Sequence, residues 1–323
     1  MKGLLILFRP YQTKSFITGI LIASLLWGLP VTANERSEPA RLASRALLLD
    51  IALAGTRLIA VGERGIVLIS DDSGKSWQQK LVPTRSLLTA VFFVDESVGW
   101  AVGHDAVILA TVDGGDSWNL QHRDKQYDDP LLDVWFKDRN NGFAIGAYGL
   151  FLSTNDSGKS WDRRQISKDD FHLNAITSLS SKELFIAAEQ GHLYHTVDGG
   201  YSWVELPSPY AGSFFGITRI NQGTILVYGL RGNLFRSADK GVTWQKIKTG
   251  TEASLMAALV QKNGTIRIVG LGGNILTSTD QGKSFSLRVR ADRKTLTSII
   301  EATDGQLVMS GSAGITIEAG DSK

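Results

Sequence analysis

The segment Ser70-Asp71-Asp72-Ser73-Gly74-Lys75-Ser76-Trp77 decides the fold, because the chain repeats its pattern. Each copy begins with Ser or Thr, followed at fixed offsets by Asp, Gly, a second Ser or Thr, and Trp or Phe. The chain contains six copies, at 70–77, 111–118, 154–161, 196–203, 237–244 and 278–285. Their aspartates lie 41 to 43 residues apart. This spacing indicates a protein built from repeated structural units.

A second phrase, Gly-x-x-Gly followed by an apolar run, recurs in step with the first. It occurs seven times, with Ala replacing one Gly in two copies, at 62–65, 103–106, 146–149, 188–191, 229–232, 270–273 and 311–314. The last copy lies 41 residues after the sixth, and the chain ends before another octapeptide. We therefore expect seven units, the seventh of them truncated.

The third unit shows which secondary structure a repeat contains. Its segments 131–136, 142–145, 150–153 and 161–166 are short, rich in β-formers and bounded by turn residues. Four antiparallel strands in about 42 residues form a propeller blade, whereas helical repeats would show a 3.6-residue period. The sequence therefore predicts an all-β protein, a seven-bladed β-propeller of four-stranded antiparallel blades over residues 45–323.

The seventh unit supplies only three strand-like segments, at 295–302, 306–310 and 314–319. An open strand edge invites pairing with other chains. We expect residues 34–44 to close the ring as a strand on this edge.

The first 33 residues are typical of an export signal. Three basic residues precede an uncharged stretch from Ser15 to Leu29, and residues 31–33 fit the small-x-small pattern before a signal peptidase site. The strongly apolar part, Phe16 to Leu29, is shorter than the roughly 20 residues of a membrane-spanning helix. We expect cleavage after Ala33 and a periplasmic or secreted protein; a retained anchor is the alternative.

The composition excludes several classes of function. The chain has 34 Lys and Arg, 32 Asp and Glu, and no Cys. The first 33 residues hold three basic residues and no acidic one, which leaves 31 basic and 32 acidic residues after cleavage. Nucleic-acid binding needs a concentrated basic face, so we expect no nucleic-acid partner. Without Cys there are no disulfides and no thiolate metal sites.

The octapeptides, known as Asp-boxes, are expected on the turns between the third and fourth strands. The Asp can accept backbone N–H bonds, the Gly supplies positive φ, and the aromatic ring is buried at the start of the outer strand. We assign structural roles to Asp72, Asp113, Asp156, Asp198, Asp239 and Asp280, and to Trp77, Trp118, Trp161, Trp203, Trp244 and Phe285. Calcium needs six to eight oxygen ligands and most copies offer one carboxylate, so we predict no metal and no cofactor.

The turns between the second and third strands are expected on the opposite face, where propellers usually bind their partners. Their residues vary between units, unlike the framework: Glu63-Arg64, His104-Asp105, Ala147-Tyr148, Glu189-Gln190, Leu230-Arg231, Leu271-Gly272 and Ser312-Ala313. Free drift of exposed turns is the alternative explanation for this variation.

A second basic segment contains Arg288, Arg290 and Arg293. Alternation puts Arg288 and Arg290 on one side of a strand, which suits an acidic partner or a solvated outer edge.

An enzyme is the less favoured interpretation. A retaining glycosidase needs two carboxylates about 5 Å apart, or a Tyr nucleophile in sialidases, inside a pocket. The longest loops here, 121–130 and 207–212, are short, and a set of arginines would be limited to Arg64, Arg231 and Arg293. His192 and His195 lie on opposite faces of a strand, so they do not form a metal pair. A carbohydrate-binding or glycoside-hydrolysing, sialidase-like propeller remains the alternative.

The second and third units carry a more specific phrase. Residues 94–103 combine a polar turn with Gly-Trp-Ala-Val-Gly and are followed by the octapeptide at 111–118; residues 137–146 repeat the order with Phe for Trp. This arrangement resembles the repeat of the photosystem II stability and assembly factor family, a propeller of Asp-box, or bacterial neuraminidase, repeats. The resemblance covers the chain from about Ala46 to Ala319.

The resemblance implies a seven-bladed propeller without known catalysis that binds membrane-protein subunits during assembly through an arginine-bearing surface. By motif, Arg231 within residues 229–235 matches that surface best, and Arg64 has the same place in its own unit. We therefore expect an exported scaffold that binds a protein, a membrane-protein subunit, on the face bearing Arg64, Tyr148 and Arg231. Similar propellers occur in bacteria that do not photosynthesise, so a photosystem is not implied as the partner.

Overall fold

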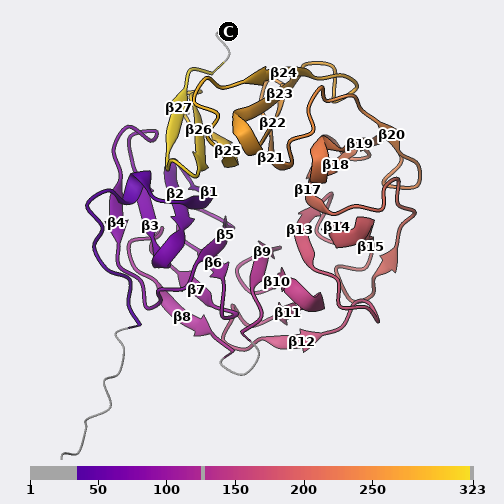
Figure 1. Ribbon diagram of the computed structural model, residues 1–323. Helices are drawn as coiled ribbons and strands as arrows, with labels where there is room; N and C mark the ends of the chain where they lie inside the picture. The colour runs from indigo at the N-terminus through magenta and orange to yellow at the C-terminus, as the bar shows by residue number, and fades with distance from the viewer. Residues whose placement is uncertain (1–34, 125–127, 321–323) are drawn as a thin grey trace, which may run out of the picture. The chain divides into compact units, whose positions relative to one another are not determined.

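The computed structural model describes residues 35–124 and 128–320, which form seven antiparallel sheets around a central channel (Figure 1). The first three blades comprise β1 (Leu48–Ala54), β2 (Arg57–Gly62), β3 (Val67–Ser70) and β4 (Gln78–Lys80); β5 (Leu88–Phe93), β6 (Gly99–Gly103), β7 (Ile108–Thr111) and β8 (Asn119–His122); and β9 (Leu131–Phe136), β10 (Gly142–Gly146), β11 (Phe151–Thr154) and β12 (Asp162–Arg164).

The remaining blades follow in chain order around the ring. Blades 4 and 5 comprise β13 (Leu173–Ser178), β14 (Leu184–Ala188), β15 (Leu193–Thr196) and β16 (Val204–Glu205); and β17 (Phe214–Arg219), β18 (Ile225–Gly229), β19 (Leu234–Ser237) and β20 (Gln245–Lys246). Blades 6 and 7 comprise β21 (Leu255–Val260), β22 (Ile266–Gly270), β23 (Asn274–Ser278) and β24 (Ser286–Val289); and β25 (Leu296–Glu301), β26 (Leu307–Gly311) and β27 (Thr316–Glu318). The predicted seven-bladed propeller is confirmed.

Burial within a blade explains the strand patterns of the sequence. The second strands, such as β10, are buried along their whole length except at Arg57 in β2, because they lie in the middle of a sheet that is covered on both faces by neighbouring blades. The fourth strands, such as β16, are exposed at the outer rim. The first strands line the channel and are partly accessible from it. Apolar side chains therefore concentrate in the middle strands.

Adjacent blades pack through apolar clusters that both sheets supply. Between blades 2 and 3, the ring of Trp100 stacks on that of Phe136, with centroids 3.4 Å apart and planes 5° apart. Between blades 7 and 1, Val308 and Ile317 meet Leu58 and Trp77. The hydrophobic core is thus divided into wedges between blades, and no blade buries its faces without its neighbours.

The predicted ring-closing strand does not form. The described part of that segment, residues 35–44, contains no strand and leads into the short helical turn η1 (Ala43–Arg45). Ser44 O accepts a bond from Ile315 N at 2.9 Å, and Ser37 N donates to Val82 O at 2.9 Å. The segment therefore runs from blade 7 to the outer part of blade 1 instead of pairing along β27. Among the described residues, blade 7 keeps three strands.

Side chains and packing between the first and last blades close the ring. Thr297 Oγ1 donates to Leu48 O at 2.8 Å, and Ser298 Oγ donates to Asp50 Oδ1 at 2.8 Å.

The predicted signal, residues 1–33, lies outside the described residues. In the part of the chain that the structure describes, no helix is long and apolar enough to cross a membrane.

Candidate protein-binding face

The octapeptides form turns whose polar groups bond mainly to one another. In blade 1, Asp72 Oδ1 accepts bonds from Ser76 N at 2.8 Å and Ser70 Oγ at 2.8 Å, and Asp72 Oδ2 accepts one from Ser76 Oγ at 2.6 Å. Gly74 N, at a residue with φ of +89°, donates to Ser70 Oγ. We call this arrangement the aspartate turn. It recurs around Asp113, Asp156, Asp198, Asp239 and Asp280.

These bonds stabilise the ionised carboxylates. The hydroxyl and N–H of Ser76 lower the pKa of Asp72 to about 2, and Ser160 and Thr243 do the same for Asp156 and Asp239. A carboxylate that already accepts three or more bonds from its own turn has little capacity left for a ligand. Within residues 35–124 and 128–320, no group of three or more His, Asp or Glu side chains is placed to hold a metal ion.

The aromatic residue of each aspartate turn packs into the cluster shared with the preceding blade. Trp118 is only 5% exposed, and its Nε1 donates to Gly115 O at 3.1 Å. Trp77 joins the cluster of blades 7 and 1. Trp161, Trp203, Trp244 and Phe285 are partly buried in the corresponding clusters. The aspartate turn therefore holds neighbouring blades together.

The turns between second and third strands are fixed by their backbone. In all seven blades the N–H after the second strand donates to a carbonyl at the start of the first strand, as from Glu63 N to Leu47 O at 3.0 Å. Five of these turns are the helical turns η2 (Glu63–Gly65), η3 (Ala147–Gly149), η4 (Glu189–Gly191), η5 (Leu230–Gly232) and η6 (Leu271–Gly273). We call the side of the ring that bears these turns the turn face.

The glycines of the second phrase have two separate physical reasons. At the first position a Cβ would lie much closer to a backbone oxygen than non-bonded atoms can approach: 2.1 Å from Leu47 O at Gly62 and 2.1 Å from Pro130 O at Gly146. The second position has positive φ, as in Gly65 at +67° and Gly232 at +68°. Blade 4 accommodates Ala188 at the first position.

Three predicted binding residues occupy equivalent places on this backbone. Arg64, Tyr148 and Arg231 are the middle residues of η2, η3 and η5, with φ of 55°, 53° and 56°. All three side chains are exposed, Tyr148 by 56%. The Tyr148 ring packs edge-on against His172, with centroids 4.9 Å apart. The turns thus hold three large side chains outward on a fixed backbone.

Comparison with known proteins assigns the chain to a family. The family model described as "Photosynthesis system II assembly factor YCF48" matches residues 69–131 and 122–254, which together cover more than half of the chain. The chain belongs to the YCF48 family. The predicted family resemblance is confirmed.

Solved structures share the fold at low identity. One described as "YCF48 bound to D1 peptide" has a TM-score of 0.71 and 17% identity, covering 86% of this chain and 93% of that chain. YCF48 from Cyanidioschyzon merolae has a TM-score of 0.68 and 15% identity, covering 88% of this chain and 99% of that chain. The WD40 β-propeller domain of Doa1 has a TM-score of 0.69 and 12% identity, covering 88% of this chain and 94% of that chain. No curated protein matches the sequence.

The other predicted basic residues of this YCF48-family chain are partly neutralised within the molecule. Arg288 and Arg290 do lie on one side of their segment, and both pair with Glu318 of blade 7, Arg290 at 2.7 Å. Arg290 also pairs with Asp292 at 2.8 Å and is largely buried. Arg293 is exposed and lies beside η6. The first two arginines therefore join blades 6 and 7, and a role in partner binding stays a prediction.

The channel holds two carboxyl groups that the sequence analysis missed. Burial raises the pKa of Asp50 to about 6 and that of Asp133 to about 7. Asp50 Oδ2 accepts a bond from Val91 N at 3.0 Å, and Asp133 Oδ2 one from Ile176 N at 2.9 Å, each in the next blade. The phrase Leu-Leu-Asp, at 48–50 and 131–133, was the available signal. Both side chains line a cavity of about 510 Å³ in the channel, and their hydrogen bonds join neighbouring blades.

The histidines considered as metal ligands have acidic partners on different sides of β15. His192 Nδ1 lies 2.7 Å from Glu205 Oε1, and His195 Nε2 lies 3.2 Å from Glu183 Oε1. His192 also stacks on Phe171, with ring centroids 3.9 Å apart. These contacts give each histidine a structural role that does not require a metal.

Proposed function

We propose that this chain is a non-catalytic scaffold that binds a segment of a protein partner, a membrane-protein subunit, on its turn face during assembly or stabilisation of a membrane complex. One observation carries this proposal: the turns display Arg64, Tyr148 and Arg231 outward while their own backbone bonds are satisfied. Arginine and tyrosine are enriched at the energetically dominant positions of protein interfaces. A fixed backbone also reduces the entropy lost on binding.

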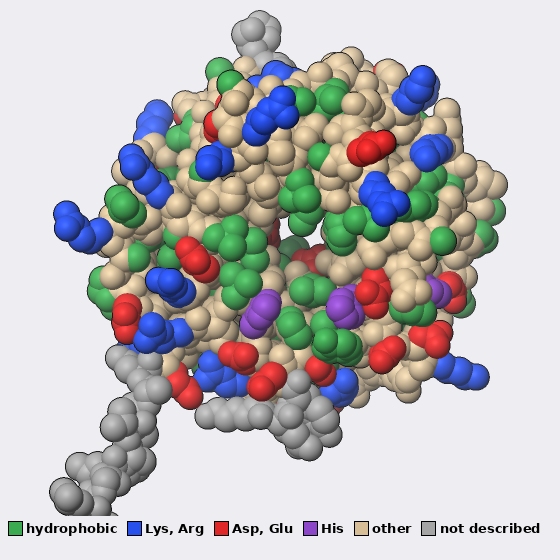
Figure 2. Space-filling view, viewed as in Figure 1, with side chains coloured by type: hydrophobic (Ala, Val, Ile, Leu, Met, Phe, Trp, Pro, Cys, Tyr) green, Lys and Arg blue, Asp and Glu red, His purple; other side chains and the backbone are tan. Residues whose placement is uncertain are grey.

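Two further observations support a protein ligand. The YCF48 family is described as a photosystem II assembly factor, and one YCF48 structure is described as bound to a D1 peptide. In the view of Figure 2, hydrophobic side chains gather around the mouth of the channel and charged side chains spread toward the rim. An apolar centre with a polar rim is the usual composition of a protein interface.

The channel carboxyl groups support the absence of catalysis. A carboxyl group with a pKa near neutrality can act as a general acid or base, as Asp133 would. However, both oxygens of Asp133 accept backbone N–H bonds, from Val134 at 2.8 Å and from Ile176. Asp50 is engaged in the same way, by Ile51 and Val91. These bonds give the two carboxyl groups a structural role, because each joins its own blade to the next one.

Export is part of the proposal and rests on the sequence of residues 1–33. We place the protein in the periplasm or outside the cell, after cleavage behind Ala33. N-terminal sequencing of the protein purified from the periplasmic fraction of its source tests this. A mature chain that begins at Asn34 supports the proposal, and a protein recovered only from the cytoplasm with Met1 intact contradicts it.

The binding experiment reverses charge on the turn face. The double variant Arg64→Glu/Arg231→Glu is used beside wild type to capture proteins from detergent-solubilised membranes of the source organism, followed by mass spectrometry. We expect the variant to lose the captured membrane protein by at least about tenfold at low salt, with a smaller difference at high salt because exposed charges are screened. Exposed turn substitutions change stability by only about 0.5 kcal/mol, so the melting temperature should be unchanged.

A matched control carries the same charge change on the opposite face. Lys159 and Lys283 are exposed residues of aspartate turns, so Lys159→Glu/Lys283→Glu should capture the partner as wild type does. Equal losses in both double variants would show a general charge effect and contradict the assignment of the turn face. Hydrolysis of a fluorogenic sialoside by the wild-type protein would favour the sialidase-like alternative.

A further inference from the structure

A cleft of about 220 Å³ lies between blades 3 and 4 on the face of the aspartate turns, away from the turn face. Its floor is formed by the rings of Trp135 and Phe143, whose centroids are 6.0 Å apart and whose planes differ by 15°. Lys137, Arg164 and Lys182 also line it. The cleft is therefore aromatic at its base and basic at its sides.

In other blades a buried or partly buried side chain occupies the place that corresponds to Lys137. Lys137 is exposed and leaves the space open. In six blades the residue after the first strand donates its N–H to the carbonyl four residues later. The residues at this place are Val94, Lys137, Leu179, Ile220, Gln261 and Ala302. Leu179, Gln261 and Ala302 are less than a tenth exposed, and Val94 and Ile220 are partly buried in apolar clusters. Lys137 alone among these six is charged and exposed.

The apolar residue normally packs with the aromatic residue of the next aspartate turn. Leu179 shares its cluster with Trp244, and Ile220 shares its cluster with Phe285. At the boundary of blades 3 and 4 the corresponding cluster contains Trp203, Trp135 and Phe143, and the exposed Lys137 adds no apolar side chain to it. An exposed lysine at this place gives up apolar packing, which a stability requirement alone does not explain.

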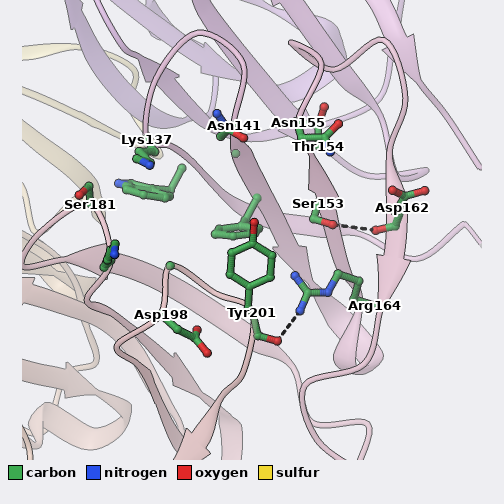
Figure 3. A pocket seen from close by; sticks show the side chains of 15 residues that line it. Lys137, Asn141, Ser153, Thr154, Asn155, Asp162, Arg164, Ser181, Asp198 and Tyr201 are labelled. Atoms are coloured by element: carbon green, nitrogen blue, oxygen red, sulfur yellow. Dashed lines mark hydrogen bonds between the residues drawn. The ribbon is translucent and has the colours of Figure 1, made fainter.

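The rim of the cleft exposes apolar surface. Tyr201, in the aspartate turn of blade 4, lines the cleft and is 82% exposed; Val197 of the same turn, outside the lining, is 65% exposed. Arg164 Nη2 donates to Tyr201 O at 2.8 Å and so joins blade 3 to blade 4 across the cleft. In Figure 3, Tyr201 lies between Lys137 and Arg164. Exposed aromatic and apolar side chains beside arginine are typical of protein-contact surfaces.

The acidic residues of the cleft offset only part of its positive charge, because three basic side chains, Lys137, Arg164 and Lys182, line it beside two acidic ones. Asp198 accepts bonds from Ser202 N, Ser202 Oγ and Thr196 Oγ1, which keep its carboxylate ionised and occupy its lone pairs. Asp162 is exposed on β12. Lys137 and Lys182 come from equivalent hairpins of adjacent blades, so both lie at the same end of the ring. An anionic ligand is therefore favoured.

We propose that this cleft is a second protein-binding site, which takes an acidic segment that inserts one aromatic side chain against Trp135 and Phe143. Its volume is below the roughly 300–1,000 Å³ of small-molecule sites but above the roughly 150 Å³ of a cavity that accepts benzene, so it suits a single anchoring ring. The acidic groups of the segment pair with Lys137 and Lys182. The site is separate from the turn face and does not rest on the function proposed for it.

The test uses fluorescein-labelled pentapeptides and the full chain, with binding followed by fluorescence anisotropy. The peptide Glu-Glu-Phe-Glu-Glu should bind, whereas Glu-Glu-Ala-Glu-Glu and Lys-Lys-Phe-Lys-Lys should bind at least about tenfold more weakly. The double variant Lys137→Leu/Lys182→Glu should bind the first peptide at least about tenfold more weakly than wild type. Lys137→Leu restores the apolar residue found in other blades, so its melting temperature should equal or exceed that of wild type.

Two control variants keep the outcomes separate. Lys159→Glu reverses a charge on the same face outside the cleft, and Arg64→Glu/Arg231→Glu alters the turn face; both should bind the acidic Phe peptide as wild type does. The proposal is overturned if no peptide binds, if Ala replaces Phe without loss, or if Lys159→Glu weakens binding as much as the cleft variant. A glycan-array signal that Lys137→Leu abolishes would assign the cleft to a sugar and overturn the peptide assignment.

Discussion

The two kinds of turn in this propeller satisfy the hydrogen-bonding groups of their backbone in opposite ways. In an aspartate turn, the side chains of residues such as Ser70, Asp72 and Ser76 satisfy the backbone and one another. On the turn face, backbone groups satisfy each other, and side chains such as those of Arg64 and Tyr148 remain outside the network. The first arrangement repeats with little change in six of the seven blades, whereas the second allows each blade a different side chain. Repetition thus marks structure here, and variation marks the candidate interface.

The largest expected effect comes from the backbone of the turn face. A Cβ at Gly146 would lie 2.1 Å from Pro130 O, so Gly146→Val forces the first and second strands of blade 3 apart. We expect a loss of about 3 kcal/mol or more in the free energy of unfolding, measured by chemical denaturation. Ala188→Gly, at the equivalent place in blade 4, is the control and should retain the fold. A stable Gly146→Val protein would show that the close carbonyl contact is not needed.

A smaller effect is expected in the aspartate turns, and it depends on pH. Asp156→Ala removes the acceptor for Ser160 and should lower the melting temperature at pH 7 by a few degrees, about 2–8 °C. The folded pKa of Asp156, about 2, is below its ordinary value of 3.8, so its stabilisation is present above pH 4 and is lost as the pH falls toward 2. The difference between variant and wild type should therefore shrink over this range.

Melting curves from pH 7 to pH 2, with partner capture at pH 7, decide whether the aspartate turns are structural. Capture by Asp156→Ala should match wild type under conditions where the variant is folded. An unchanged melting temperature together with lost capture would reverse the distinction between the two kinds of turn.

The smallest effect on stability is expected at the exposed side chains of the turn face. Tyr148→Ala removes a ring that packs only edge-on against His172, so the free energy of unfolding should change by about 0.5 kcal/mol or less. Partner capture should nevertheless fall, because exposed tyrosines often anchor interfaces. Val242→Ala, at a residue that is 63% exposed in the aspartate turn of blade 5 and outside the cleft, serves as the control. Equal capture by both variants would remove Tyr148 from the interface.

The sequence predicted those features that depend on local geometry and repeat in each unit. The glycine positions, the four-strand order and the aspartate turns all follow from residues within about ten positions of one another. The pairing of Glu318 with Arg288 and Arg290 was missed because these residues lie 28 to 30 positions apart in different blades. Their encounter depends on how neighbouring sheets are placed, which the repeat pattern does not specify.

Two further features could have been found by aligning the units strand by strand. Asp50 and Asp133 follow the same Leu-Leu pair, and Lys137 stands where other units have apolar residues or Gln261. The octapeptide alone does not reveal them, because they lie at the ends of the inner strands. Residues 35–44 were wrongly expected to form a strand, since the bonds that Ser37 and Ser44 make to distant carbonyl and N–H groups are not visible in a local pattern.

The closure of the ring also constrains the order in which the protein can fold. The bonds from Thr297 to Leu48 and from Ser298 to Asp50 join residues separated by 249 and 248 positions. The entropic cost of closing so long a loop grows only with the logarithm of its length, so distance does not forbid it. Nevertheless, these bonds require nearly the whole chain. During synthesis the apolar flank of blade 1, which includes Leu58, stays uncovered until blade 7 is complete, so the finished length of the chain, and not its first blades, determines when the molecule becomes stable.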